Sequence, residues 1–342
     1  MSTDTSSSQN PPDAALVQLV FGKCISMAIS VVAKLRVADL LADGPKTVAD
    51  LATNTKTHAP SLYRILRTLA AAGVFSEQVD GRFALAPMGE YLRTGVKGSV
   101  RGMADFFGSD WSWRAWGHLL ETVQTGRTAF DRVFGEPVFE YLRKRPDESA
   151  VFNEGMTGFS SNIAPAVAEA YNFAAFKTVV DVGGGHGVLL NTILEAYPGV
   201  NGIVFDSPHV VVGAEDAIRK ADLMERCQAV GGDFFERVPD GGDAYLMKHI
   251  VHDWPDDRAT TILRNCRKGV NPGGKLLLVE LVIAPGNAAD VGKVVDLEML
   301  AIASGKERTE LEYRQLLAGA GWRLTRVLPT KSPTQIVEAE PA

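Results

Sequence analysis

Three acid-base side chains in the second half of the chain could move a proton. His252 lies just past the end of an expected strand, Glu280 lies within the apolar strand LLLVELVI, and Glu307 lies in a loop that leads into a helix. An imidazole takes up a proton near neutral pH, and a carboxylate bonded to one ring nitrogen leaves the other nitrogen basic. A lone histidine is more often structural. With two glutamates available to orient it, we interpret His252 as a general base.

A glycine-rich turn in the middle of the chain indicates a nucleotide-type site. The apolar run 178–182 is followed by GGGHG, which begins at Gly183, and then by a helix-like segment. Glycines allow positive φ and let a ligand approach the amide groups at the start of the helix. A dinucleotide fingerprint would need glycine at position 188, which is Val188. Asp181, before the turn, instead suits a cofactor with a cationic amino-acid end. A strand-helix turn without a ligand is the alternative.

Two further stretches are typical of an adenosine site. Asp206 ends the strand IVFD, where an acid accepts hydrogen bonds from a ribose diol, although it could also only cap the next helix. Asp233 and Phe234 follow the third expected strand. That carboxylate can accept from an adenine amino group, while the phenyl ring covers the face of the base.

A metal site is the alternative to an adenosine-containing cofactor at these strand ends. His249, His252 and Asp253 could be ligands, but no second cluster of histidine or cysteine complements them at a known spacing. We therefore expect no metal.

Length, charge and cysteine content limit the classes of protein. A chain of 342 residues is expected to form two domains. A net charge of -6 argues against a nucleic-acid partner, and three scattered cysteines indicate neither disulfides nor zinc, which fits the cytoplasm. Residues 1–12 lack the pattern of a secretory signal and are expected to form a disordered tail.

Residues 13–105 follow a winged-helix plan. We expect a long apolar helix over 14–41, helices at 47–52 and 58–72, and a hairpin over 74–85. No apolar run reaches the length of a membrane span, so the long helix is expected to pack against a second subunit of a homodimer. DNA binding is disfavoured because the second of the shorter helices offers only Arg64 and Arg67 outside its apolar positions.

Residues 106–342 are expected to form a doubly wound α/β domain. Its mainly parallel strands are expected at 178–182, 202–206, 227–231, 243–249 and 275–283, and a terminal antiparallel pair at 322–328 and 334–338. Before the sheet, the aromatic helical segment 106–170 could line a pocket for a flat acceptor, although core packing is the better interpretation for any one ring. The candidate pocket residues are Phe107, Trp111, Met156, Phe159, Met299 and Ile302.

Taken together, these motifs resemble a known family. VVDVGGGHG, VFDSPHV, GGDFF, DAYLMKHIVHDWPDD, NPGGKLLLVE and GKERTELEY are similar, in order and spacing, to S-adenosylmethionine-dependent small-molecule O-methyltransferases of the caffeate and hydroxyindole type. The resemblance covers nearly the whole chain. It implies a Rossmann-like catalytic domain, an N-terminal winged-helix dimerisation domain, no metal, and S-adenosylhomocysteine as the second product.

The resemblance also assigns roles to individual residues. His252 matches the general base of the family, and Glu280 and Glu307 match the carboxylates that hold it. The residues expected to bind the cofactor are Asp181, Gly183, Gly185, Asp206, Asp233, Phe234, Lys248, Asp253 and Trp254.

The expected reaction is therefore methyl transfer to a hydroxyl of an aromatic, phenolic or polyketide-like molecule. The apolar pocket positions give no polar code for the acceptor. N-methylation of a heteroaromatic amine such as a phenazine is the alternative reaction. A ligand-responsive winged-helix transcription regulator is the alternative from another class of protein.

Overall fold

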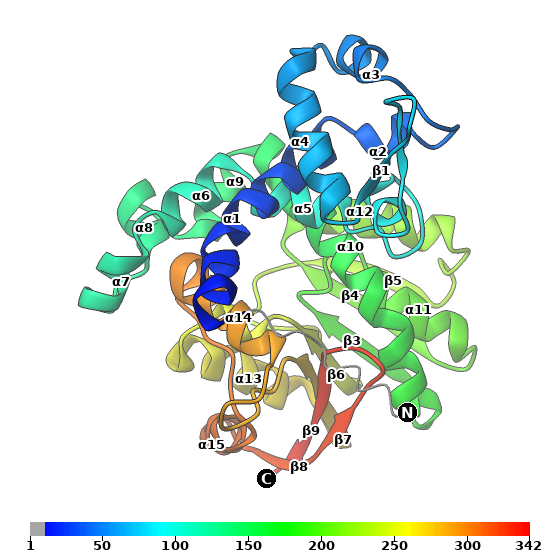
Figure 1. Ribbon diagram of the computed structural model, residues 1–342. Coiled ribbons are helices and arrows are strands. Elements are labelled where there is room, and N and C mark those ends of the chain that lie inside the picture. The colour runs from blue at the N-terminus through cyan, green and yellow to red at the C-terminus, as the bar shows by residue number, and fades with distance from the viewer. Residues whose placement is uncertain (1–10) are drawn as a thin grey trace, which may run out of the picture. The chain divides into compact units, whose positions relative to one another are not determined.

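The computed structural model describes residues 11–342 (Figure 1). The chain divides into two compact units, one up to Ser109 and the other from Asp110 to Ala342. The tail expected over residues 1–12 lies almost wholly outside the described residues, and the first helix begins at Pro12. The domain boundary expected after residue 105 stays a prediction.

The first unit combines helices with one β-hairpin. Its elements are α1 (Pro12–Lys34), α2 (Val37–Leu40), α3 (Val48–Thr55), α4 (Ala59–Ala71), β1 (Phe75–Glu77), β2 (Phe83–Leu85), η1 (Gly89–Leu92) and α5 (Arg101–Phe107). Thr47 caps α3 by accepting a hydrogen bond from the Asp50 backbone N–H at 3.1 Å. Strands β1 and β2 pair antiparallel, and Gly81 between them has a φ of +79°. The order helix, helix, hairpin of a winged-helix plan is therefore confirmed.

Helix α1 has an apolar, largely exposed face. Five of its side chains are between 52% and 77% exposed: Leu16, Val17, Leu19, Val20 and Phe21. Among the described helices, α1 is the one that is long and apolar enough to cross a membrane by length and composition alone. Lys23 interrupts the apolar residues of this helix, which is why no run of membrane-spanning length was expected from the sequence.

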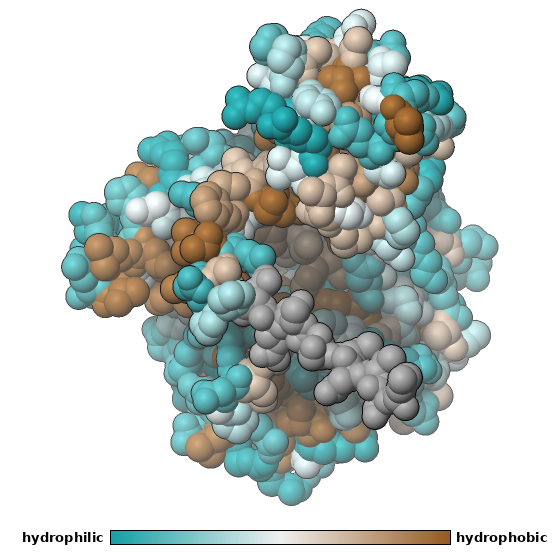
Figure 2. Space-filling view, viewed as in Figure 1, coloured by the Kyte–Doolittle hydropathy of each residue, from teal (hydrophilic) through white to brown (hydrophobic). Residues whose placement is uncertain are grey.

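The second unit begins with a helical segment rich in aromatic side chains. Its elements are α6 (Asp110–Trp116), α7 (Leu119–Thr125), α8 (Ala129–Phe134), α9 (Val138–Arg143), α10 (Pro146–Ala170) and η2 (Phe173–Ala175). Trp111, Phe130 and Tyr141 are buried and pack edge to face or tilted, with centroids 5.3–6.5 Å apart. Figure 2 shows apolar surface over the outer end of α7, where Leu120 and Val123 are exposed. These three rings thus serve as core.

A seven-stranded sheet follows, with the order β5-β4-β3-β6-β7-β9-β8. Its strands are β3 (Thr178–Val182), β4 (Asn201–Asp206), β5 (Cys227–Gly231), β6 (Gly242–Lys248), β7 (Val270–Glu280), β8 (Trp322–Pro329) and β9 (Gln335–Pro341). The first five are parallel, whereas β9 runs antiparallel to both β7 and β8. The expected doubly wound sheet with a terminal antiparallel hairpin is confirmed.

Helices cover both faces of this sheet because successive strand residues point to opposite sides. Val179 and Leu246 lie in a core that includes residues of α10 and of α11 (Val188–Ala196) and α12 (Pro208–Lys220). Val180 and Tyr245 lie in a second core with residues of α13 (Asp256–Gly269) and α15 (Glu310–Gly319). The chain reverses its direction of winding between β3 and β6, and ligands of such folds bind outside the strand ends at this point.

Candidate functional site

The glycine turn after β3 lies at the winding reversal. Gly183, Gly185 and Gly187 have φ values of +71°, +58° and +75°, a region that residues with a Cβ rarely adopt. At Gly183 a Cβ would also lie 2.4 Å from Cδ1 of Ile250, so both the backbone conformation and the close packing favour glycine there. The turn therefore brings backbone amides to the start of α11 without side chains in the way.

Asp206, at the end of β4, holds this turn in place. Its Oδ2 accepts a hydrogen bond from the Gly185 N–H at 2.8 Å, and its Oδ1 accepts from the Ser207 N–H at 2.6 Å. Burial raises the pKa of Asp206. Each carboxylate oxygen has a second lone pair, so the acid can still accept hydrogen bonds from a ligand.

A second acid, Asp181, is buried beneath the turn. Its Oδ2 has no hydrogen-bond partner within residues 11–342. Burial raises the pKa of Asp181 to about 7, while the neighbouring positive charge of Lys248 opposes that rise. Burial lowers the pKa of Lys248, because it disfavours the charged ammonium just as it disfavours a carboxylate. The structure therefore places the predicted cofactor-binding residue Asp181 beneath the turn, with an unsatisfied oxygen and the charge of Lys248 nearby.

Aromatic rings gather where the adenine was expected. Phe234 lies 6.1 Å from Trp254, centroid to centroid, and Phe235 meets the same indole edge to face at 4.7 Å. Asp233 accepts a hydrogen bond from the Phe235 N–H at 2.8 Å. The indole stacks on Phe139 at 5.3 Å. The structure therefore brings Asp233, Phe234 and Trp254 into one neighbourhood.

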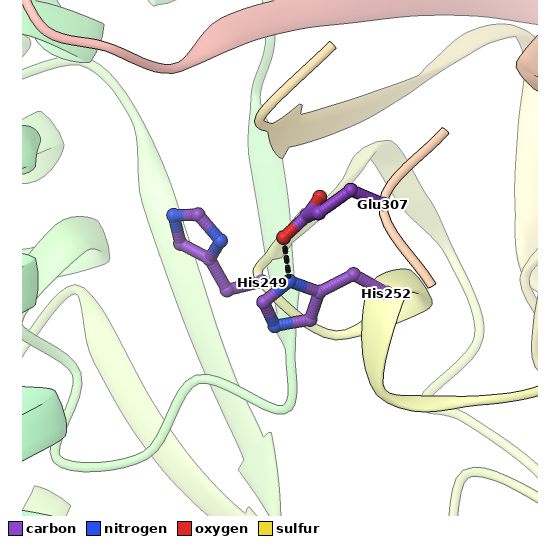
Figure 3. Close-up of side chains that lie close together, drawn as sticks. All are labelled: His249, His252 and Glu307. Carbon is purple, nitrogen blue, oxygen red and sulfur yellow. Dashed lines mark hydrogen bonds and ion pairs between the residues drawn. The ribbon is translucent and has the colours of Figure 1, made fainter. Parts of the chain in front are cut away.

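The acid-base residues lie at the ends of β6 and β7. His252 lies in a short helix, η3 (Val251–Asp253), and its Nδ1 is 2.6 Å from Oε1 of Glu307 (Figure 3). Glu280 holds η3 by accepting the Val251 N–H at 3.1 Å, and its other oxygen lies 3.9 Å from Nδ1 of His252. Asp253 Oδ1 lies 3.4 Å from Nε2. The predicted trio is thus brought together by strand ends and one loop.

Burial dominates the electrostatics of this group. It raises the pKa of Glu307 to about 8 and the pKa of Glu280 and Asp253 to about 7. The His252 charge opposes the rise at Glu280 and Asp253. Three buried carboxyl groups, each costly to ionise, therefore surround this one imidazole.

The predicted pocket residues separate into groups. Phe159 of α10 lies 5.4 Å from His249, centroid to centroid, and Met156 is half-buried one helical turn before it. Met299 and Ile302 are buried in η4 (Met299–Ala303), a π-helix that continues α14 (Val291–Glu298). Trp111 belongs to the aromatic core of the helical segment, which is a sufficient reason for its presence. Phe107 lies in the first unit at the end of α5.

Comparison with known proteins identifies the family. An O-methyltransferase domain matches residues 116–323, and an O-methyltransferase dimerisation domain matches residues 17–95. The chain is 45% identical to a phenazine O-methyltransferase, PhzM, of Lysobacter antibioticus over 97% of each chain. The chain belongs to the O-methyltransferase family.

Two solved structures of methyltransferases have the same fold as this chain. The crystal structure of LaPhzM superimposes with a TM-score of 0.94 at 45% identity, covering 97% of this chain and 100% of the other. The O-methyltransferase NcsB1 from neocarzinostatin biosynthesis, solved with S-adenosylmethionine and 2-hydroxy-5-methyl naphthoic acid, has a TM-score of 0.79 at 34% identity. It covers 93% of this chain and 96% of its own. The methyltransferase thus uses S-adenosylmethionine.

The residues at the winding reversal fit that cofactor. Positive-φ glycines leave room for a ligand against the backbone, and Asp206 keeps lone pairs for a diol. The unpartnered Oδ2 of Asp181 leaves a buried acceptor beneath the turn. The individual binding roles stay predictions.

Arg308 is a buried residue beside the acid-base group of the methyltransferase, and the sequence did not reveal its contacts. It is fully buried and donates to Asp256 Oδ1 at 2.8 Å. It also donates to the carbonyls of Val251 at 3.0 Å, Trp254 at 2.9 Å and Lys306 at 3.2 Å. One guanidinium therefore joins the loop that carries Glu307 to the segment that carries His252. Only the loop motif GKERTE hinted at it.

His186, the histidine of GGGHG, is a second residue without a predicted role. Its Nδ1 lies 3.0 Å from the hydroxyl of Thr157 on α10. Its ring packs on α12 at Gly213, where a Cβ would lie 2.6 Å from the imidazole. The glycine turn of the methyltransferase is therefore tied to the helix that carries Met156 and Phe159.

One cluster of the methyltransferase has the composition of a metal site. Within the part of the chain that the structure describes, ligand atoms of His249, His252 and Glu307 lie within 4.8 Å of one another. In the sequence, the two histidines were candidate ligands together with Asp253, whereas the structure groups them with Glu307. The short His252–Glu307 contact is already a hydrogen bond, which favours an acid-base function of this pair.

Proposed function

We propose that this methyltransferase transfers a methyl group to a hydroxyl of an aromatic small molecule, with His252 as the general base. The observation that carries the proposal is the buried 2.6 Å contact between His252 Nδ1 and Glu307 Oε1 at the winding reversal. Glu280 supports the same segment through the Val251 N–H. A base positioned in this way removes the proton that makes a phenol a poor nucleophile.

The phenolic proton moves to Nε2 of His252. Bound S-adenosylmethionine supplies an electrophilic methyl group on a sulfonium. Glu307 engages Nδ1 of His252, which leaves Nε2 to accept the phenolic proton as the oxygen attacks. The resulting imidazolium is stabilised by Glu307, Glu280 and Asp253, whose burial disfavours negative charge without a positive partner. N-methylation of an amine would not need such a base, so the arrangement favours a hydroxyl.

The acceptor is proposed to be a flat, fused or substituted phenol. Phe159, Met156, Met299 and Ile302 present apolar surface near the acid-base group or on the neighbouring π-helix. The relatives support this class, since one is named for a phenazine and another binds a naphthoic acid. Apolar and aromatic linings with a few polar groups are typical of sites for such molecules.

A homodimer is proposed to form through the first unit. The exposed apolar face of α1 would be costly in water, and the dimerisation domain of the family spans this helix from residue 17. A second copy would cover that face, which explains an apolar N-terminal helix without a membrane.

Three free cysteines, Cys24, Cys227 and Cys266, support a cytoplasmic location.

Methyl transfer is tested directly with labelled cofactor. Incubation with methyl-labelled S-adenosylmethionine and a panel of phenols, naphthols and hydroxylated heteroaromatics should give a labelled ether in mass spectrometry. EDTA should leave the rate unchanged, because the proposed chemistry needs no metal. Loss of activity in EDTA that added divalent cation restores would instead favour the cluster of His249, His252 and Glu307 as a metal site.

Replacement of Asp206 is expected to weaken cofactor binding. Asp206→Ala removes an acceptor from the proposed ribose site and also the anchor of the Gly185 amide. A hydrogen bond to a charged group contributes about 1.5–3 kcal/mol, so Kd should rise roughly 10- to 150-fold. Calorimetry with S-adenosylhomocysteine measures the change. Asp216→Ala, at an exposed ion pair on α12, is the matched control. Unchanged affinity for Asp206→Ala would refute the ribose assignment.

A further inference from the structure

His249 holds an unusual backbone conformation at the end of β6. Its φ is +52°, in the left-handed region, while its N–H still donates to the Val279 carbonyl at 3.1 Å. That region costs a residue with a Cβ roughly 1–2 kcal/mol, and glycine would avoid the cost. A histidine retained in this conformation indicates that its side chain has a use there.

The imidazole of His249 is buried without hydrogen bonds. The residue is 8% exposed, and neither Nδ1 nor Nε2 has a hydrogen-bond partner among residues 11–342. Its nearest carboxylate, Glu280, keeps Oε2 3.8 Å from Nδ1, and that oxygen also has no hydrogen-bond partner in the described chain. Each buried polar group left unsatisfied costs about 1–3 kcal/mol. A bound molecule that satisfies this ring would recover that energy.

The surroundings of His249 place it beside the reaction. Its ring centroid lies 4.9 Å from that of His252 and 5.4 Å from that of Phe159. Figure 3 shows the two imidazoles side by side, with Glu307 bonded to His252 and His249 unpaired in this group. An aromatic acceptor whose hydroxyl meets His252 would therefore present its neighbouring ring positions to His249.

Its surroundings disfavour a positive charge on the ring of His249. Burial lowers its pKa well below the ordinary value, and the positive charges of Lys248 and His252 lower it further. A neutral imidazole offers one donor and one acceptor, so it recognises a polar atom rather than an anion.

We propose that His249 is a specificity-determining residue that hydrogen-bonds a heteroatom of the acceptor next to the reacting hydroxyl. The preferred substrates are then aromatic hydroxyl compounds with a nitrogen, hydroxyl or amino group ortho or peri to that hydroxyl. This inference rests on the proposed function, because it takes His252 as the group that meets the hydroxyl. His249 would then make a second polar contact with the acceptor, besides that of His252 with the hydroxyl, which the apolar pocket residues cannot make.

Two probes of equal shape test the inference. 8-Hydroxyquinoline carries a ring nitrogen peri to its hydroxyl, and 1-naphthol has a carbon at that position. Binding to the protein saturated with S-adenosylhomocysteine is measured by calorimetry in EDTA, so that neither turnover nor chelation matters. One satisfied buried hydrogen bond of about 1–3 kcal/mol predicts that 8-hydroxyquinoline binds roughly 5- to 150-fold more tightly.

Three variants assign that preference to His249. His249→Phe keeps a ring without nitrogens, and His249→Gly adopts positive φ without strain, so both should bind the two probes equally. His249→Asn tolerates the left-handed conformation and keeps a donor and an acceptor, so part of the preference should survive. If His249→Phe does not fold, His249→Gly still decides.

The outcomes separate this inference from the proposed function. Equal affinity of the wild type for both probes, no binding of either, or an unchanged preference in His249→Phe and His249→Gly would overturn it. Loss of the binding preference through His249 alone supports it. His252→Ala should retain the preference in binding, so a failure of the base to affect turnover would refute the proposed mechanism and leave the assignment of His249 standing.

Discussion

Replacement of His252 by alanine is expected to lower kcat by about two to four orders of magnitude, the usual contribution of a positioned general base. Cofactor affinity should change little, because the imidazole is bonded to Glu307 and not to the glycine turn. Single-turnover methyl transfer, with S-adenosylhomocysteine binding measured in parallel, separates these two effects.

Two controls sharpen this prediction. His118→Ala removes a half-exposed histidine of the same unit and should leave kcat unchanged. Glu307→Gln keeps a hydrogen-bonding group but no negative charge, so it should lower kcat less than His252→Ala and still measurably. Turnover of His252→Ala close to that of the wild type would show that alignment of the hydroxyl and the methyl group suffices.

Arg308→Met is expected to lower the free energy of unfolding by about 2–4 kcal/mol, because it leaves buried carbonyls without donors. The affected carbonyls belong to Val251 and Trp254, on the segment that carries His252. A fall in the urea midpoint of tryptophan fluorescence measures the loss. Activity should fall as well, because the Glu307 loop would no longer be fixed to that segment.

Arg314→Met is the matched control for this prediction. Like Arg308, Arg314 forms an ion pair with a carboxylate, that of Glu310, but both side chains of this pair are about half exposed. Exposed pairs contribute about 0–1 kcal/mol, so this variant should unfold almost as the wild type does. Equal midpoints for Arg308→Met and the wild type would contradict the structural role of the buried guanidinium.

Local patterns were sufficient to predict much of this molecule. Strand β3 and its glycine turn were predicted because an apolar run, three glycines and a helical period adjoin one another. The pairing of His252 with Glu307, 55 positions apart, was expected from the resemblance to a family in which carboxylates hold the base. Strand β7 begins at Val270 rather than at residue 275, because Pro272 and two glycines obscure its pattern.

Other features depend on packing that no pattern encodes. Arg308 was identified from the sequence only as a charged residue of the GKERTE loop. Its structural role depends on hydrogen bonds to carbonyls of a segment distant in the sequence. His249 was weighed as a metal ligand, and its missing hydrogen bonds appear only when every neighbour is known. The sequence indicated only that His186 belongs to the glycine turn. Its contact with Thr157 of α10 depends on how the two elements pack.

The position of β9 sets an order of assembly. This strand is synthesised after both of its neighbours, because it follows β7 and β8 in the chain but lies between them in the sheet. While the chain is being made, β7 therefore exposes an open edge and β8 has no partner strand. Open edges of this kind invite pairing with other chains. The catalytic sheet can close only after the residues near 341 have left the ribosome, so nascent chains of this protein should depend on chaperones until then.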